Sequence, residues 1–240
     1  MYKFVCHILT FIVIPFHLYG AWCILFKTSK AMMSVRNLLL WGHFLSALLD
    51  LEINFLSVCY VLFPTLSGYA FGVVNNPPIE VFVNMTTTSF VVTSILGIFE
   101  NRYFIIFAQN TKWRRIRKPY LAVNYFLAAI VFLPLLSNIP DQAEGARAVS
   151  NILPCTPELT IKNRHLFVLT LDFRVPFFCL AFGTLSLAVQ IISFSVVTFL
   201  KLRARDSRTR CNISRKTQKL QKNFVKALFV QVGFPLKAIG

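Results

Sequence analysis

Long apolar stretches alternate along this chain with short polar or basic connections. Crossing the hydrocarbon core of a bilayer takes about 20 helical residues, and six stretches approach or exceed that length, the last running to the final residue. None alternates apolar and polar positions like a transmembrane β-strand, so each predicts a helix that bonds its own backbone. The expected helices cover residues 4–26, 38–63, 81–108, 120–138, 172–200 and 223–240. We therefore predict an all-α, polytopic transmembrane bundle built as one membrane domain from residues 1–240.

The composition supports lipid as the surrounding solvent. Hydrophobic residues make up 56% of the 240 positions and charged residues only 14%, whereas soluble domains carry about a quarter charged residues. The first stretch has a basic start at Lys3, as a signal peptide would. It is longer than the usual apolar core of a signal peptide, and no clear small-x-small cleavage site follows it. We expect it to be a retained helix.

Lys and Arg are distributed unevenly among the connections. The first, third and fifth connections are basic, whereas residues 64–80 contain no Lys or Arg. Because basic residues mark the cytoplasmic side, we expect an external N-terminus and a basic cytoplasmic loop at residues 201–222. The net charge of +16 is split among three loops without a recognition motif, which argues against nucleic acid and favours membrane lipid as the partner.

The second stretch carries a polar face near the middle of the membrane. Its members recur at spacings of three and four residues, which places them on one side of a helix; they are His43, Ser46, Asp50, Asn54 and Ser57. Ser46, Asp50 and Asn54 are candidates for an intramembrane polar network that rearranges or binds an ion. Hydrogen bonding that only holds helices together is the other interpretation. Glu52 points to the opposite side, where we expect a partner on a neighbouring helix or a protonated carboxyl.

Hydroxyl side chains crowd the outer half of the third stretch. Thr87, Ser89 and Thr93 are candidates for lining a ligand pocket. The alternative is packing, because hydroxyls readily bond to their own helix.

The inner end of the third stretch carries Glu100, Arg102 and Tyr103. An acid and an arginine there could form a lock that opens on activation. The simpler interpretation is a positively charged anchor with a tyrosine at the interface.

Further along, Arg215, Lys219 and Lys222 fall on one helical face. That face could contact a cytoplasmic partner, or it could be a solvated stripe. Pro235 should kink the sixth helix.

Enzyme motifs are absent from the sequence. It has no phosphate-binding glycine loop, no zinc-protease motif and no nucleophile elbow. The six cysteines have no metal-ligand spacing, so we expect no enzyme, metal or cofactor. Cys155 lies in an external connection, and Cys59 and Cys179 are its candidate disulfide partners.

Several short motifs resemble the nematode chemoreceptors of serpentine receptor class H. They are Glu100-Asn101-Arg102-Tyr103-Phe104, Arg117-Lys118-Pro119-Tyr120 with Asn124-Tyr125, Ile139-Pro140-Asp141-Gln142, Leu153-Pro154-Cys155 and Leu220-Gln221-Lys222. The resemblance covers nearly the whole chain from Val13 onward. It implies a seven-helix G-protein-coupled receptor in the plasma membrane of chemosensory neurons, with the sensory cilium as a specific site.

The same resemblance implies roles for individual residues. Glu100, Arg102 and Tyr103 would correspond to the activation motif, with Arg215, Lys219 and Lys222 contacting a heterotrimeric G protein. The ligand would be a small environmental molecule of unknown identity. Two departures stand out: Glu100 and Arg102 are two residues apart rather than adjacent, and no cysteine begins the third helix to pair with Cys155.

The sequence ends within the sixth stretch, so we expect a fragment, a doubtful gene model or a truncated product without helix seven. Two other hypotheses therefore stay open. One is a small ion-coupled transporter or channel that depends on Asp50. The other is a truncated membrane protein that does not signal.

Overall fold

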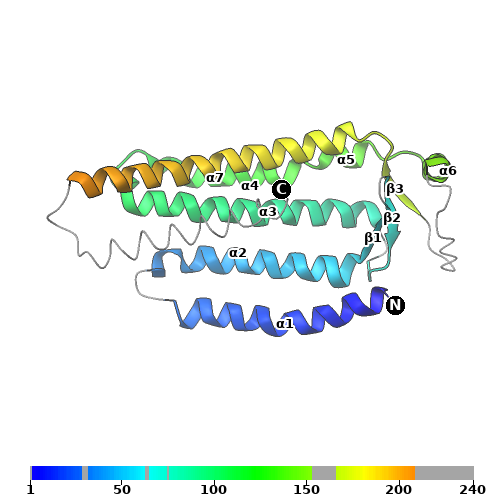
Figure 1. The fold of residues 1–240 in the computed structure, drawn as a ribbon, viewed down its shortest axis with the longest axis horizontal. Helices are drawn as coiled ribbons and strands as arrows, with labels where there is room; N and C mark the ends of the chain where they lie inside the picture. Colours follow the sequence, from blue (N-terminus) through cyan, green and yellow to red (C-terminus); the bar gives the residue numbers. More distant parts are fainter. Residues whose placement is uncertain (1, 29–31, 63–64, 75, 153–165, 209–240) are drawn as a thin grey trace. The chain divides into compact units, whose positions relative to one another are not determined.

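Long helices make up most of the chain in the computed structural model (Figure 1), which describes residues 2–28, 32–62, 65–74, 76–152 and 166–208. The long helices are α1 (Tyr2–Phe26), α2 (Met33–Leu51), α3 (Pro77–Tyr103), α4 (Trp113–Ile130) and α7 (Arg174–Arg208). One π-helical segment, η2 (Glu52–Ser57), continues α2, and another, η3 (Phe104–Ala108), continues α3. The short elements are α5 (Leu133–Ser137), α6 (Gln142–Ile152), β1 (Cys59–Leu62), β2 (Leu66–Ala70) and β3 (Phe167–Thr170).

Five of these helical segments are long and apolar enough to cross a membrane. They are Tyr2–Phe26, Val35–Ser57, Pro77–Ala108, Trp113–Ser137 and Arg174–Ala204. The predicted polytopic helical membrane fold is thereby confirmed. The sixth predicted span, at 223–240, lies outside the described residues, as do Pro235, Arg215, Lys219 and Lys222.

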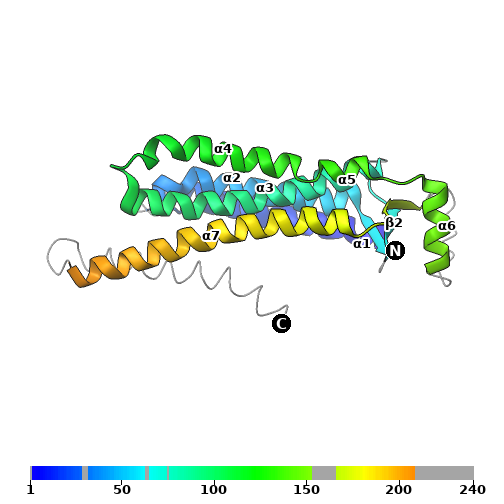
Figure 2. The same cartoon turned by 90° about the horizontal axis from the view of Figure 1, so that it is seen from above.

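Consecutive helices pack side by side and run in alternating directions. Helix α1 contacts α2, α2 contacts α3, and α3 contacts α4; Figure 1 shows this order, and Figure 2 shows α4 and α7 on opposite sides of α3. Residues Met1–Ile191 form one compact unit, and the chain from Ile192 onward belongs to a second. Within the first unit, the α1–α2 and α3–α4 connections lie at one end of the helices. We call this the basic end, after Lys27, Arg36, Arg114 and Arg115.

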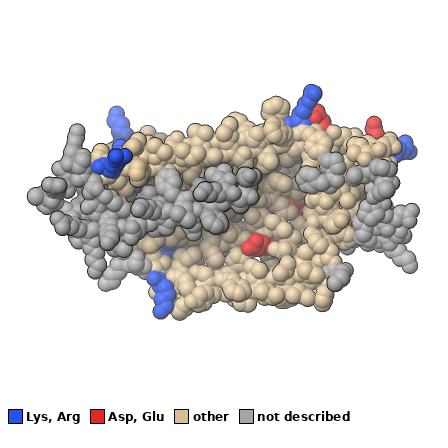
Figure 3. Space-filling view, viewed as in Figure 1, with Lys and Arg blue, Asp and Glu red and all other residues tan. Residues whose placement is uncertain are grey.

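The outer surface of the helices is strongly apolar. Phe4, Phe11 and Phe16 on α1 are each about 70% exposed, and Phe177, Phe178 and Phe182 on α7 are similarly open. On the face drawn in Figure 3, the basic side chains lie toward the helix ends, and the surface between them is uncharged apart from an acidic group near its centre. Such a surface suits hydrocarbon and not water.

A small antiparallel sheet caps the opposite end of the bundle, which we call the sheet end. Its strand order is β1-β2-β3, with Cys59 opposite Ala70 and Leu66 opposite Thr170. The sequence did not predict these strands, and the expected helix at 38–63 is wrong at its C-terminal end. Residues such as Tyr60 and Val61 are as apolar as a membrane helix and equally suited to a strand.

The change from helix to strand occurs at Val58. This residue adopts the left-handed conformation with φ of 39°, which is uncommon for a β-branched side chain. The Phe71 and Gly72 amides then donate to the carbonyls of Val58 and Ser57 at 3.1 and 2.9 Å. Gly72 is required here, because a Cβ at this position would lie 1.8 Å from the carbonyl oxygen of Leu56.

The predicted helix at 120–138 is also revised. It begins earlier, at Trp113, and is interrupted at Val131 and Phe132 before α5. Pro134 explains the interruption, because proline has no N–H with which to continue the helix.

The Ile139-Pro140-Asp141-Gln142 motif attaches α6 to the sheet. The Asp141 carboxylate accepts the amides of Ala143 and Glu144 at 2.8 and 3.2 Å, which caps α6. Gln142 bonds both backbone groups of Val168: its Nε2 donates to the carbonyl at 3.1 Å, and its Oε1 accepts the amide at 2.9 Å. The Gln142 side chain thus occupies the free edge of β3, where a fourth strand would otherwise pair.

Candidate functional site

The most enclosed charge in the described chain is Glu100, on α3 at the basic end. Its side chain is fully buried. The Trp113 indole Nε1 donates to Oε1 at 2.7 Å, and the Arg117 guanidinium donates to Oε2 at 2.9 Å. Both partners come from the first turns of α4, so one carboxylate joins two consecutive helices.

Arg117 makes further contacts around this pair. Its Nη2 also donates to Oδ1 of Asn101 at 2.7 Å, and its guanidinium carbon lies 4.0 Å from the centre of the Phe104 ring. The arginine therefore has an anion, an amide oxygen and an aromatic face as neighbours. We call Glu100, Asn101, Phe104, Trp113 and Arg117 the α3–α4 cluster.

The predicted lock between Glu100 and Arg102 takes a different form. The ion pair of Glu100 is with Arg117, whereas Arg102 is half-buried on the same helix. Side chains two residues apart on a helix diverge, so an intrahelical pair is unfavourable. Tyr103 lies beside Phe107, with ring centres 6.3 Å apart. In the sequence, Arg117 was recognised only within the Arg117-Lys118-Pro119-Tyr120 motif and not as a partner of Glu100.

Tyr120 extends the cluster toward α7. Its ring centre lies 5.3 Å from that of Trp113, and its hydroxyl donates to Oε1 of Gln190. Contacts therefore run from Glu100 through Trp113 and Tyr120 to Gln190, linking α3, α4 and α7.

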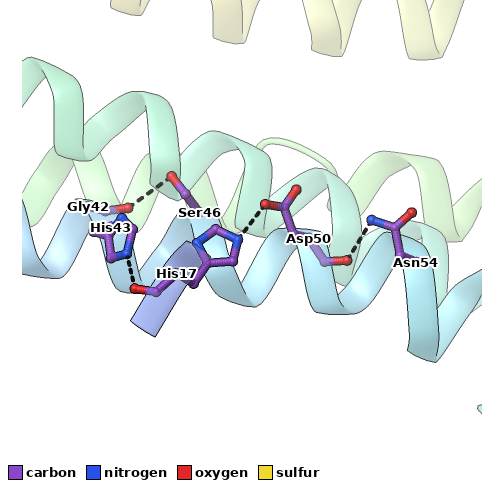
Figure 4. Close-up of polar contacts among 6 residues, drawn as sticks. All are labelled: His17, Gly42, His43, Ser46, Asp50 and Asn54. Carbon is purple, nitrogen blue, oxygen red and sulfur yellow. Dashed lines mark hydrogen bonds and ion pairs between the residues drawn. The ribbon is translucent and has the colours of Figure 1, made fainter. Parts of the chain in front are cut away.

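The polar face of α2 meets α1 in the middle of the bundle (Figure 4). His17 on α1 bonds Oδ2 of Asp50 through Nε2 at 2.8 Å, and His43 donates from Nε2 to the carbonyl of His17 at 2.9 Å. The carboxylate of Asp50 stays about half exposed. A cavity of about 270 Å³ with mostly apolar walls adjoins His17, Asp50 and Asn54.

Ser46 and Asn54 bond their own helix rather than the carboxylate. Ser46 donates to the carbonyl of Gly42 at 3.0 Å, and Asn54 donates to the carbonyl of Asp50 at 3.0 Å. The partner that sequence reasoning missed is His17. It lies on another helix, with no spacing relation to Asp50.

The candidate pocket residues on α3 separate into two environments. Thr87 is buried and donates to Oε1 of Glu52 at 3.1 Å, which supplies the neighbouring-helix partner expected for Glu52. Thr93 is fully buried and donates to the carbonyl of Ser89. Ser89 lines a cavity between α3, α4 and α7.

The described residues contain no group of three or more His, Cys, Asp or Glu that could hold a metal ion. Cys59 and Cys179 are free thiols, and Cys155 lies outside the described residues. Burial, together with the nearby Glu80 carboxylate, raises the pKa of Cys59 to about 11. Its thiol is therefore the unreactive protonated form at neutral pH.

Comparison with known proteins places this site in a family context. The model of the serpentine type 7TM GPCR chemoreceptor Srh family matches residues 1–240. Serpentine receptor class H-72 of Caenorhabditis elegans is 28% identical over 162 residues, covering 63% of this chain and 46% of that protein. The chain thus spans about half the length of the curated relative it matches. No solved structure matches it.

Proposed function

Because this chain belongs to the serpentine chemoreceptor family Srh, we propose that it acts as a G-protein-coupled chemosensory receptor, or as part of one. It detects small environmental molecules at the sheet-end half of the bundle and signals at the basic end. The protein is a multi-pass membrane protein. Its proposed location is the plasma membrane of chemosensory neurons, including the sensory cilium, with the basic end in the cytoplasm.

The single observation that carries this proposal is the buried Glu100–Arg117 ion pair. It ties α3 to the start of α4, where Arg114, Arg115 and Lys118 are exposed. Replacing Arg117 alone leaves the fully buried Glu100 carboxylate uncompensated. Such a pair can therefore favour one helix arrangement strongly over another, as a two-state switch needs.

Activation would separate Arg117 from Glu100 and release the basic start of α4. That segment, together with Arg102 and the predicted basic face of Arg215, Lys219 and Lys222, would then contact the G protein. We retain Glu100, Arg102 and Tyr103 as the proposed activation motif and add Arg117 as the partner of the Glu100 carboxylate.

Nucleotide exchange tests the proposal. The complete chain is reconstituted in vesicles with a panel of purified heterotrimeric G proteins, and GTP uptake is measured. We expect Glu100→Gln to raise basal exchange several-fold, and charge reversal of Arg102, Arg215 and Lys219 together to abolish it. Exchange that is unaffected by this triple reversal would show the assignment to be wrong.

A second candidate function is ion-coupled transport. The observation favouring it is the contact among His17, His43 and Asp50 across α1 and α2 (Figure 4), because protonatable groups within a membrane mark ion pathways. Asp50→Asn should then abolish proton or sodium flux into vesicles containing the chain. A receptor gives no flux in either form.

A further inference from the structure

A cavity of about 260 Å³ lies between α3, α4 and α7, within the first unit of the chain. It forms beside the interruption of α4, where Val131 and Pro134 line one wall. Gly183 of α7 lies opposite. A Cβ added at Gly183 would meet only the side chain of Val131, at 3.8 and 4.0 Å, so this wall leaves open space.

Polar and apolar residues share the walls of this cavity. Leu127, Val131, Phe182 and Leu187 are among its apolar residues. The polar residues are Ser89, Asn124, Ser186 and Gln190. None of the described residues that line the cavity is charged, so an ionic ligand would lack compensation from them. A neutral molecule with an apolar body fits these walls.

The amides retain hydrogen-bonding capacity for such a molecule. Asn124, which is buried, donates from Nδ2 to the carbonyl of Tyr120 at 3.0 Å. Gln190 donates from Nε2 to the carbonyl of Ser186 at 3.1 Å and accepts from the Tyr120 hydroxyl. A primary amide has two donor hydrogens and two acceptor lone pairs, so each side chain can make additional bonds.

The cavity volume limits the size of the ligand. A dry cavity of about 150 Å³ accommodates benzene, so a cavity of about 260 Å³ suits a molecule of roughly ten non-hydrogen atoms. Medium-chain alcohols and ketones have this size, an apolar body and one group that can bond an amide.

We propose that the α3–α4–α7 cavity binds a small, neutral, amphipathic molecule whose single hydroxyl or carbonyl group bonds Asn124 or Gln190. The role of this cavity as a receptor's ligand site rests on the proposed function, but binding to the cavity can be measured independently of that function. Gln190 contacts Tyr120, and Tyr120 packs on Trp113 of the α3–α4 cluster. A ligand that takes a bond from Gln190 is therefore connected to Glu100 through Tyr120 and Trp113.

Photolabelling tests the site directly. The probe is octan-1-ol bearing a diazirine, applied to the purified complete chain in detergent, with adducts located by peptide mass spectrometry. We expect adducts on α4, α5 and the first half of α7, and competition by octan-1-ol but much weaker competition by octane. Equal competition by octane would indicate a site for lipid chains and overturn the proposal.

Matched variants locate the probe. Gly183→Leu should fill the cavity and lower labelling at least about tenfold, whereas Gly183→Ala should retain it, since its added methyl makes only ordinary contacts. Ala47→Leu fills the separate α1–α2 cavity and should leave labelling unchanged. If Gly183→Leu does not fold, Ser186→Val tests the same wall. Undiminished labelling in a folded filling variant would overturn the proposal.

The two proposals can fail separately. Labelling without any G-protein exchange would preserve the ligand site and contradict the receptor function. Exchange that depends on Glu100 without labelling of α4 or α7 would do the reverse. In a chain that passes both tests, Gln190→Leu should weaken competition by octan-1-ol and also change basal exchange.

Discussion

The two ends of the helix bundle are held together by different interactions. At the basic end, one buried carboxylate, Glu100, joins α3 to α4 through Arg117 and Trp113. At the sheet end, β1, β2 and β3 pair through their backbones, and the neutral side chain of Gln142 extends that pairing to α6. The first end depends on charge and the second on backbone geometry.

This difference indicates which end can act as a switch. A charged partner can compete for Arg117 or Glu100. If Arg117 is drawn away, the buried Glu100 carboxylate is left unpaired, at a large cost in free energy. The sheet end, by contrast, has many small, neutral bonds that no single charge can replace. We therefore expect rearrangement at the basic end and a more constant cap at the sheet end.

Removing one member of the buried ion pair should have the largest effect. Arg117→Met should destabilise the folded chain by about 3–5 kcal/mol, because it leaves the fully buried Glu100 carboxylate unpaired, and Glu100→Gln should cost less, because Arg117 is partly exposed. Thermal unfolding in detergent measures the loss. The double variant should recover part of it, and Arg114→Met, an exposed change on the same helix, should have little effect. Equal losses from Arg114→Met and Arg117→Met would contradict the role of the pair.

A backbone clash at the sheet end should rank second. Gly72→Ala places a methyl group against the carbonyl of Leu56, which is backbone and cannot move aside easily. We expect a loss of about 1–3 kcal/mol, typical of overpacking. Gly183→Ala is the matched control and should cost little. The same thermal measurement compares the two, and a neutral Gly72→Ala would show that the turn after β2 differs from this description.

Truncating Gln142 should have a smaller and more local effect. Gln142→Ala removes both bonds to Val168, each worth about 1 kcal/mol. Hydrogen exchange should accelerate at the amide of Val168, while amides around Glu100 keep their protection. Faster hydrogen exchange at the basic end as well would mean that the two ends are coupled, and would contradict the proposal that they are held together independently.

The smallest effect concerns the Cys59 thiol. Its pKa of about 11 means that alkylation should be slow at pH 8 and rise about tenfold per pH unit up to about pH 10, since the thiolate is the reactive form. Glu80→Gln removes the carboxylate that helps to raise the pKa, so it should increase the rate at pH 8 a few-fold. A plateau below pH 9 in the unaltered chain would contradict the raised pKa.

Sequence reasoning found individual residues of the site more readily than their partners. Asp50 and Glu100 stood out because charged groups are rare within apolar stretches. Their partners, His17 and Arg117, lie 33 and 17 positions away. No periodicity within one helix connects residues on different helices, so these pairs could not be predicted from spacing.

The strands were missed for another reason. Hydropathy records the polarity of the surroundings, and Cys59–Leu62 is as apolar as the helix before it. The choice between helix and strand was made by pairing with β2 and β3, and β3 lies about a hundred residues later in the chain.

The sequence by itself determined that lipid surrounds this protein, approximately where its helices run, and which connections carry positive charge. These properties follow from the local cost of placing polar or apolar groups in a bilayer, and that cost is readable residue by residue. Only the tertiary structure decided that Glu100 pairs with Arg117, that Gln142 completes the sheet and that a cavity opens beside Gly183. These features depend on which faces of separate helices meet, and that is settled by packing over the whole bundle.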